Sequence, residues 1–202
     1  MDVAVNLAPY VAKDGVAVVM GADAEANTRT ALLLAGLWAR ARGATYEDGA
    51  VTCFNPALSR REERDKYRAV VPCAHLCPSW DHVALQDLLV QQRRRTAARR
   101  THQAEYSVFV VLHTGSSTAE FFDMSAAQDL VASGRTLGIY TVLVLDNVPS
   151  VLPALLRTAA NVFFHVHDAT CADQPLQDAS WDMARPRIRT LPLYPHRHPA
   201  KL

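Results

Sequence analysis

Residues 16–28 read Val16-Ala-Val-Val-Met20 and then Gly21-Ala-Asp-Ala-Glu-Ala-Asn-Thr28, and a long apolar segment follows at once. The first five residues are apolar without a polar alternate, which is typical of a strand buried on both faces of a sheet. The next eight residues begin with glycine and predict a turn, and residues 27–42 have the length and composition of a helix. The segment therefore predicts one βα unit of a parallel α/β sheet.

Short Val-rich runs alternate with amphipathic segments along the rest of the chain, and this alternation predicts a mostly parallel sheet flanked by helices. We expect strands at residues 16–20, 50–54, 74–76, 107–112, 140–145 and 161–166. We expect helices at residues 27–42, 82–100, 118–133 and 151–158. The highly charged residues 59–68 predict a solvated helix or loop.

Length and composition indicate one globular domain, because the 202 residues are 50% hydrophobic and 20% charged. The net charge of +1 gives no global excess that would attract nucleic acid or a membrane. The start of the chain lacks a basic segment followed by an apolar run, and every apolar run is too short to cross a bilayer. We therefore expect a soluble protein without a signal peptide or a membrane partner.

The pattern of strands and helices stops near residue 168, so we expect a domain at 1–168 and a Pro-rich tail at 169–202. Prolines at this density disfavour helices and central strands. The tail prolines are Pro175, Pro186, Pro192, Pro195 and Pro199. Two interpretations stay open: an irregular tail that lies across its own domain, or an arm that docks on a neighbouring subunit.

The turn after the first strand has the layout of a phosphate-binding P-loop, whose pattern is GxxxxGK[ST]. Gly21 and Thr28 match this pattern, while Ala26 and Asn27 stand where the second glycine and the lysine belong. Such a loop needs converging backbone N–H groups, a lysine on the phosphates and a hydroxyl on Mg²⁺. Gly21, Ala26, Asn27 and Thr28 are therefore the candidate nucleotide-binding positions, and a plain βα turn is the alternative.

The order of the features that follow is more specific than the turn. A segment Asn55-Pro-Ala-Leu-Ser leads through Tyr67 and Pro72 to a helix that bears Gln91-Gln92. A strand ending at Leu112 comes next, and then Gly134-Arg135 precedes the strand at 140–145. The segment from Val148-Pro to Arg157 comes before the last strand.

This succession, over residues 16–166, resembles the genome-packaging ATPases of poxviruses and related large DNA viruses, in the FtsK/HerA superfamily of P-loop NTPases. The resemblance implies a three-layer sheet of the RecA/FtsK type, with ATP and Mg²⁺ as the cofactors if any bind. It also implies homo- or hetero-oligomers with packaging-ATPase-like subunits, with DNA as a possible further partner. The location that it implies is the host cytoplasm, in a viral factory, or the virion.

The chain departs from this family at the positions that the family uses for catalysis. Asn27 replaces the lysine, His113-Thr114 replace two acidic residues, and Asp146 replaces a glutamine. Arg157 matches a family arginine that reaches the nucleotide of a neighbouring subunit. Phosphoryl transfer depends on positioning and charge stabilisation, so these losses predict little turnover. We expect no catalytic residues in the ordinary sense.

The resulting expectation is a degenerate packaging-type ATPase, catalytically impaired, that acts as a structural or regulatory subunit. An active DNA-packaging motor with a divergent site is one alternative. A non-nucleotide-binding α/β structural protein is another. A Rossmann oxidoreductase would need GxGxxG after the first strand, and the sequence there supplies only the first glycine, Gly21.

Two further clusters carry possible chemistry. The arginines at the end of the helix at 82–100 could bind nucleic-acid phosphates or simply be solvated, and they are Arg93, Arg94, Arg95, Arg99 and Arg100. Cys73, His75 and Cys77 alternate along one short strand, with Cys53 as the nearest fourth ligand. This spacing is not an established zinc pattern, so we expect no metal site.

Overall fold

The computed structural model describes residues 15–42, 51–72, 74–79, 82–99, 107–114, 118–146, 154–160, 162–168 and 188–193. The strands are β1 Val16–Met20, β2 Val51–Phe54, β3 His75–Cys77, β4 Val108–His113, β5 Ile139–Leu145, β6 Val162–Asp168 and β7 Ile188–Leu193. The α-helices are α1 Ala24–Ala41, α2 Arg61–Val70, α3 His82–Arg99, α4 Thr118–Asp123, α5 Ser125–Ser133 and α6 Ala154–Ala159. Two 3₁₀ helices, η3 Pro56–Ser59 and η4 Gly134–Leu137, complete the described elements.

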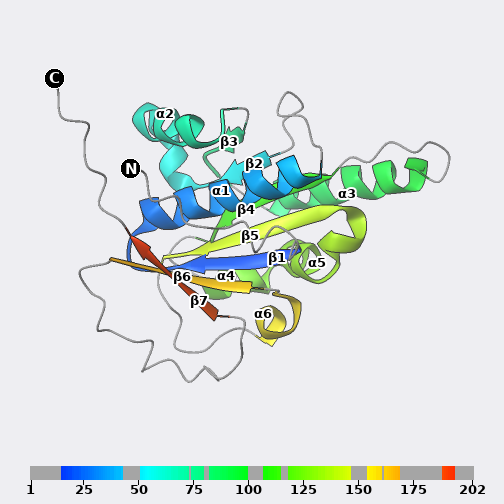
Figure 1. The fold of residues 1–202 in the computed structure, drawn as a ribbon. Coiled ribbons are helices and arrows are strands. Elements are labelled where there is room, and N and C mark those ends of the chain that lie inside the picture. The colour runs from blue at the N-terminus through cyan, green and yellow to red at the C-terminus, as the bar shows by residue number, and fades with distance from the viewer. Residues whose placement is uncertain are drawn as a thin grey trace.

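The strands form one seven-stranded sheet in the order β3-β2-β4-β5-β1-β6-β7, and every strand pair is parallel (Figure 1). β1 therefore lies between β5 and β6, and two strands separate it from β2. A Rossmann sheet has the order 3-2-1-4-5-6, which puts the first strand beside the second. The observed order is thus not that of a dinucleotide-binding Rossmann domain.

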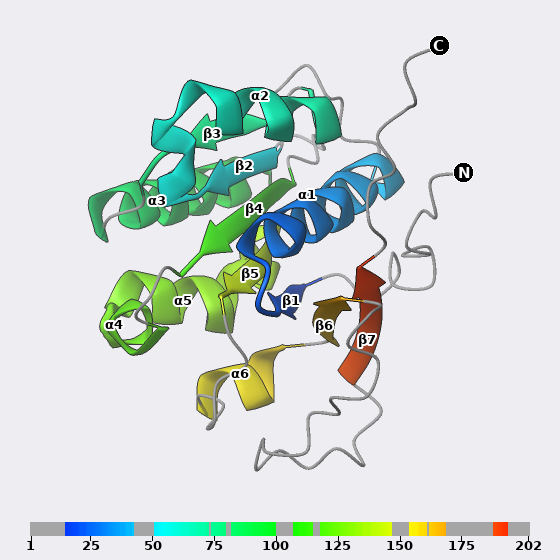
Figure 2. The same ribbon diagram turned by 90° about the vertical axis from the view of Figure 1, so that its left-hand side faces the viewer.

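Helices cover both faces of the sheet, as a parallel sheet with apolar strands requires (Figure 2). One core lies between the sheet and α1, η3 and α2, and it contains Trp38, Leu58 and Tyr67. The other lies between the sheet and α3 to α6, and it contains Leu89 and Phe121. The α/β prediction with a parallel sheet flanked by helices is therefore confirmed.

The structure differs from the expected helices in two places and decides between the two alternatives in a third. α1 begins at Ala24, three residues earlier than predicted. The helix expected at 118–133 is divided into α4 and α5, with an extended residue, Met124, between them. The highly charged segment forms a regular helix, α2, that buries Tyr67.

The expectation of an irregular tail after residue 168 is wrong for residues 188–193. These form β7, which pairs with β6 along the edge of the sheet. Pro192 is compatible with this strand because proline is tolerated on edge strands, where one side needs no ladder hydrogen bond. The other tail residues lie outside the described part of the chain. Among the described helices, none combines the length and the apolar character needed to cross a membrane.

Candidate functional site

The carboxyl ends of β1, β2, β4 and β5 meet at one edge of the sheet, because all four strands are parallel. In open α/β sheets this is the edge where ligands bind. It collects six of the candidate residues that the sequence singled out, together with Asn55, and all of them are largely buried except Asp146. The group comprises Gly21, Asn27, Thr28, Asn55, His113, Thr114 and Asp146. We call it the carboxyl-edge cluster.

The turn after β1 is short and closed, so the prediction of an eight-residue turn is wrong. Only Gly21, Ala22 and Asp23 separate β1 from α1. Asp23 is the N-cap, and its Oδ1 accepts a hydrogen bond from the backbone N–H of Ala26 at 3.0 Å. A helix N-terminus attracts anions because its N–H groups are unpaired. Here a carboxylate of the chain itself already occupies that position.

Gly21 is required by a close approach of two strand ends. A Cβ built on Gly21 would overlap the carbonyl oxygen of Val166 in β6. It would also lie 2.9 Å from Oδ1 of Asn27. The glycine therefore allows backbone and side chain to pack into the turn, and this is a structural reason for its presence.

Asn27 points into the protein and not outward as a phosphate-binding lysine would. Its Nδ2 donates to the carbonyl oxygen of Gly21 at 2.8 Å and to that of Leu145 at 3.2 Å. The residue has no exposed surface, and Oδ1 has no hydrogen-bond partner among the described residues. The amide thus joins the ends of β1 and β5 from the first turns of α1.

The hydroxyl of Thr28 faces other groups of the protein. Its Oγ1 donates to the carbonyl oxygen of Ala24 at 2.9 Å and accepts from Nδ2 of Asn55 at 3.1 Å. The side chain of Tyr67 lies within hydrogen-bonding reach of Thr28. The Thr28 hydroxyl is therefore engaged with groups of α1, β2 and α2. Burial raises the pKa of Tyr67 to about 12, so this phenol stays protonated near neutral pH.

His113 and Asp146 form a close pair across the ends of β4 and β5. Nε2 of His113 lies 2.8 Å from Oδ1 of Asp146, although Oδ1 does not receive an aligned hydrogen bond. His113 is 6% exposed. The neighbouring Thr114 donates its backbone N–H to the carbonyl oxygen of Val144 at 3.0 Å. The end of β4 therefore carries an imidazole that lies beside the carboxylate at the end of the neighbouring strand β5.

The remaining predicted site residues do not join this cluster as ligands. Ala26 lies in the first turn of α1 and contributes its N–H to the Asp23 cap. Arg157 lies in α6, but its side chain is outside the described part of the chain. Exposed Arg93 and Arg94 lie on α3, and Arg93 pairs with Asp129 of α5 at 3.2 Å. The side chains of Arg95 and Arg99, and all of Arg100, fall outside the described residues.

The thiols do not assemble a metal site among the residues that the structure describes. Sγ of Cys77 lies 3.6 Å from Nδ1 of His75 on the edge strand β3. Burial of the Cys53 thiol raises its pKa to about 12, and the nearby Cys77 adds a smaller effect in the same direction. A thiol with such a pKa is neither a ready nucleophile nor a ready metal ligand. Cys73 lies outside the described residues.

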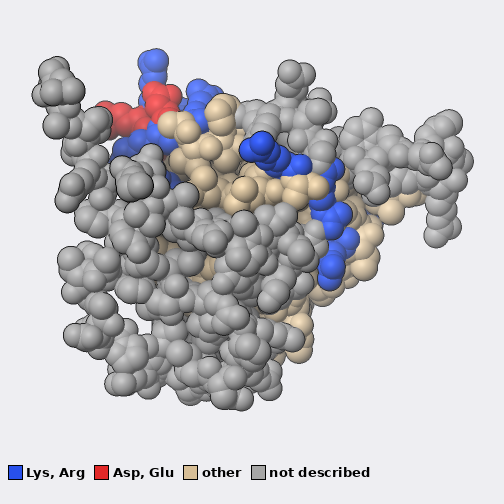
Figure 3. Space-filling model, in the orientation of Figure 1, with Lys and Arg blue, Asp and Glu red and all other residues tan. Residues whose placement is uncertain are grey.

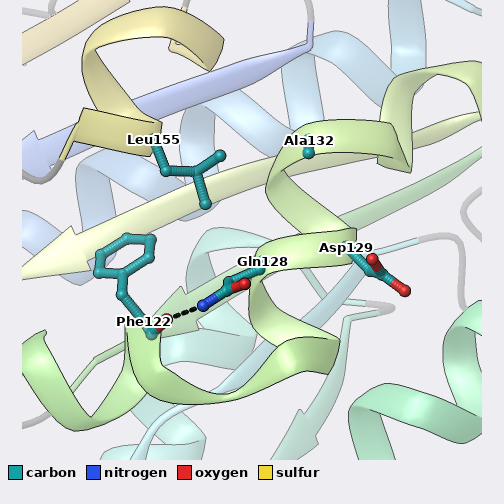
Figure 4. Close-up of a pocket in the computed structure, with 5 residues that line it drawn as sticks. All are labelled: Phe122, Gln128, Asp129, Ala132 and Leu155. Carbon is teal, nitrogen blue, oxygen red and sulfur yellow. Dashed lines mark hydrogen bonds between the residues drawn. The ribbon is translucent and has the colours of Figure 1, made fainter.

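A cavity of about 300 Å³ lies among α4, α5 and α6 and is separate from the carboxyl-edge cluster (Figure 4). Its lining is Phe122, Gln128, Asp129, Ala132 and Leu155. The polar groups there already have partners within the chain, since Nε2 of Gln128 donates to the carbonyl oxygen of Phe122 at 2.7 Å and Asp129 pairs with Arg93. Nothing in its lining points to a particular ligand.

No site role was predicted from the sequence for Asn55 and Tyr67, which contact Thr28. A partial signal existed, because Asn55 follows a buried strand directly and precedes a proline, as a local capping residue does. Oδ1 of Asn55 indeed accepts from the backbone N–H of Ala57 at 2.9 Å. The contact between Tyr67 and Thr28 joins two helices and has no local signature in the sequence.

A scan of known protein families finds no match to this chain. A search of curated proteins finds no related sequence either.

Proposed function

We propose that this domain is a degenerate P-loop-type ATPase, related to viral DNA-packaging ATPases, that serves as a structural or regulatory subunit with little or no ATP hydrolysis. The observation that carries the proposal is the closed turn between β1 and α1. Asp23 occupies the helix N-terminus, Asn27 faces inward, and the hydroxyl of Thr28 is hydrogen-bonded to Ala24 and Asn55.

The strand order supports the relationship. The long strands of the sheet's centre run β2-β4-β5-β1-β6. In P-loop ATPases of the RecA and FtsK type, the strand before the P-loop likewise lies between the sensor strand and the last core strand. The strand with the acidic residues lies beyond the sensor strand, where β4 lies here. The positions that differ chemically, His113 and Asp146, are at the ends of these two strands.

The charges at the carboxyl-edge cluster argue against a triphosphate. Asp23 and Glu25 lie in or next to the first turn of α1, and the family's lysine is replaced by an amide. The nearby Lys66 of α2 contacts Glu25 at 3.2 Å and Glu63 at 2.9 Å, so its charge is already balanced. The described residues of this turn, 21–26, include no lysine or arginine that would offset the repulsion between these carboxylates and phosphate.

A domain with the fold of an ATPase but without the catalytic side chains suits a structural subunit of an oligomer. We propose that its partners are copies of itself or packaging-ATPase-like subunits, in a viral factory or the virion. Its role there is to hold neighbours in register or to regulate them.

The test is a titration with Mg-ATP while the thermal midpoint of unfolding is recorded. A ligand at about 100 times its Kd adds about 2.7 kcal/mol to the folded state. For a domain of this size such a gain raises the midpoint by roughly 5–10 °C. We expect no rise. A rise together with ATP turnover that Thr28→Ala abolishes would instead support an active motor with a divergent site.

A further inference from the structure

His75 and Cys77 lie side by side on β3, the strand at one end of the sheet. Because side chains alternate along a strand, residues two positions apart point to the same face. Sγ of Cys77 lies 3.6 Å from Nδ1 of His75 and 4.0 Å from Nε2. His75 is exposed and Cys77 is half-buried, so both groups can be reached from solvent.

The separation of these two side chains is that of two ligands on one zinc ion. Zinc binds cysteine sulfur at about 2.3 Å and histidine nitrogen at about 2.0 Å in tetrahedral geometry, so such a pair lies about 3.5 Å apart. A hydrogen bond between thiol and imidazole spans a similar distance, and only a measurement of bound metal separates the two. Burial raises the pKa of the Cys77 thiol, and zinc displaces the thiol proton when it binds.

The pair supplies only half of a closed zinc site, because structural sites have four protein ligands. Among the described residues, no group of three or more histidine, cysteine, aspartate or glutamate side chains is placed to hold a metal ion. Cys53 on the neighbouring strand β2 belongs to the core on one face of the sheet, while Cys77 packs against the core on the other. A closed site therefore needs two ligands from beyond these residues.

The outer side of β3 allows a second copy of the chain to supply them. Among the described strands β3 pairs only with β2, and Figure 2 shows it at the border of the sheet. The strand has three residues, and Pro78 directly after it has no N–H to donate, so a strand ladder with another chain would be short. Contact through a metal ion needs only side chains, and in a twofold contact both copies contribute the same residues.

The charges of α2, which lies near β3 in Figures 1 and 2, do not oppose this contact. Figure 3 shows Lys and Arg side chains among the Asp and Glu side chains in the region of α2. The helix carries the basic residues Arg61, Arg64, Lys66 and Arg68 and the acidic residues Glu62, Glu63 and Asp65. Surfaces of such mixed charge repel each other little.

We propose that His75 and Cys77 bind Zn²⁺ as half of a tetrahedral site, which a second copy of the chain completes with the same two residues. The ion then joins the β3 edges of two chains, and its role is structural because protein groups fill all four positions. The inference goes beyond the proposed function, since it concerns the edge strand and requires neither a P-loop nor a nucleotide.

The test adds zinc chloride to the reduced, metal-free chain and measures bound zinc by elemental analysis and molar mass by sedimentation velocity. We expect one zinc ion for every two chains and a doubling of the molar mass, both reversed by a chelator. Co²⁺ in place of zinc is expected to give the visible absorption of a tetrahedral site with thiolate ligands. One zinc ion per chain without a change in mass, or no zinc bound by the folded wild type, would overturn the proposal.

Two variants, Cys77→Ser and His75→Ala, each remove one ligand from both copies. We expect zinc affinity to fall at least about tenfold and the zinc-dependent doubling of mass to disappear. The matched controls are Cys53→Ala, which removes a buried thiol, and His82→Ala, which removes an exposed imidazole at the start of α3. Both controls are expected to bind zinc as tightly as the wild type. Equal loss in the controls, or full retention in Cys77→Ser, would contradict the assignment, and circular dichroism confirms that each variant is folded.

Discussion

Asn27 shows how one side chain changes the use of a whole turn. A lysine at this position would extend its charge toward a ligand, whereas the amide donates to the carbonyl oxygen of Gly21, directly after β1, and to that of Leu145 in β5. Because these groups are buried, their hydrogen bonds matter more when they are broken than when they form. The side chain of Asn27 therefore stabilises the fold through buried hydrogen bonds.

Replacing Asn27 should destabilise the protein strongly. In Asn27→Ala the carbonyl oxygens of Gly21 and Leu145 lose a buried donor, so we expect a loss of about 2–4 kcal/mol in the free energy of unfolding. Urea denaturation measures the loss. Leu33→Ala is the control on the same helix, because Leu33 is 43% exposed, and it should change stability by less than about 1 kcal/mol. Equal stability of Asn27→Ala and wild type would contradict the assigned role of the amide.

Two glycines with different surroundings give a second comparison. Gly21→Ala places a methyl group against the backbone of Val166, so we expect a loss of about 2 kcal/mol or more. Gly134 has helical backbone angles, and a Cβ there meets only ordinary contacts, the nearest at 3.4 Å. Gly134→Ala should therefore be neutral or stabilise the protein by up to about 1 kcal/mol. Thermal melts of the two variants measure both changes in stability. A Gly21→Ala variant as stable as the wild type would contradict the close packing of the turn.

At the scale of elements, α2 packs against the carboxyl-edge cluster and stabilises it. Tyr67 is 1% exposed, packs in the core beneath α2 and bonds to Thr28 of α1. Asn55, at the end of β2, bonds to the same hydroxyl. Three elements thus meet at one oxygen atom, and the salt bridges of Lys66 add little because they are half exposed.

This packing predicts a loss of stability in alkali. Burial raises the pKa of Cys53 from 9.0 to about 12 and that of Tyr67 from 10.0 to about 12. Both groups are more easily deprotonated when unfolded, so their contribution is complete below pH 9 and is lost as the pH rises toward 12. Each contributes up to about 1.4 kcal/mol per pH unit within its window.

Urea denaturation at a series of pH values from 8 to 11 checks this expectation. The Cys53→Ala variant should lose stability less steeply than wild type from pH 9 upward. Tyr67→Phe should differ from wild type in slope only above about pH 10, where phenols begin to ionise. Identical slopes in all three proteins would mean that neither group is as buried as the packing indicates.

The sequence predicted the elements well where the apolar pattern was unambiguous. β1, β4 and β5 fall within one residue of the predicted ranges, because continuous Val-rich runs have few alternatives in an α/β protein. The start of α1 was missed, because Asp23 was interpreted as a phosphate-loop residue when it is a helix N-cap. β7 was missed because its proline is acceptable only at a sheet edge, and the edge is known only once the strand order is known.

The position of the candidate site could be predicted from the sequence, but the contacts of its side chains could not. Parallel strands must bring residues such as His113 and Asp146 to one edge, and the sequence located both. It could not show that Asn55 and Tyr67 contact Thr28, since those contacts join segments 27 and 39 positions away. Side-chain contacts between such distant segments produce no periodic pattern in the sequence.

For the molecule as a whole, the fold and the side-chain chemistry of the carboxyl-edge cluster have to be distinguished. The sheet order and the two-sided helical covering position a ligand edge, while the side chains at that edge bond to one another. This internal hydrogen bonding is the basis of the proposal that the domain acts with little or no ATP hydrolysis.

The most direct measurement is a crystal structure of the chain grown with Mg²⁺ and a non-hydrolysable ATP analogue. We predict the same three-residue turn, with Asp23 capping α1 and Asn27 bonded to Gly21 and Leu145, and no triphosphate at the end of β1. An opened loop with the analogue's phosphates against the first turn of α1 and Mg²⁺ on Thr28 would contradict the account.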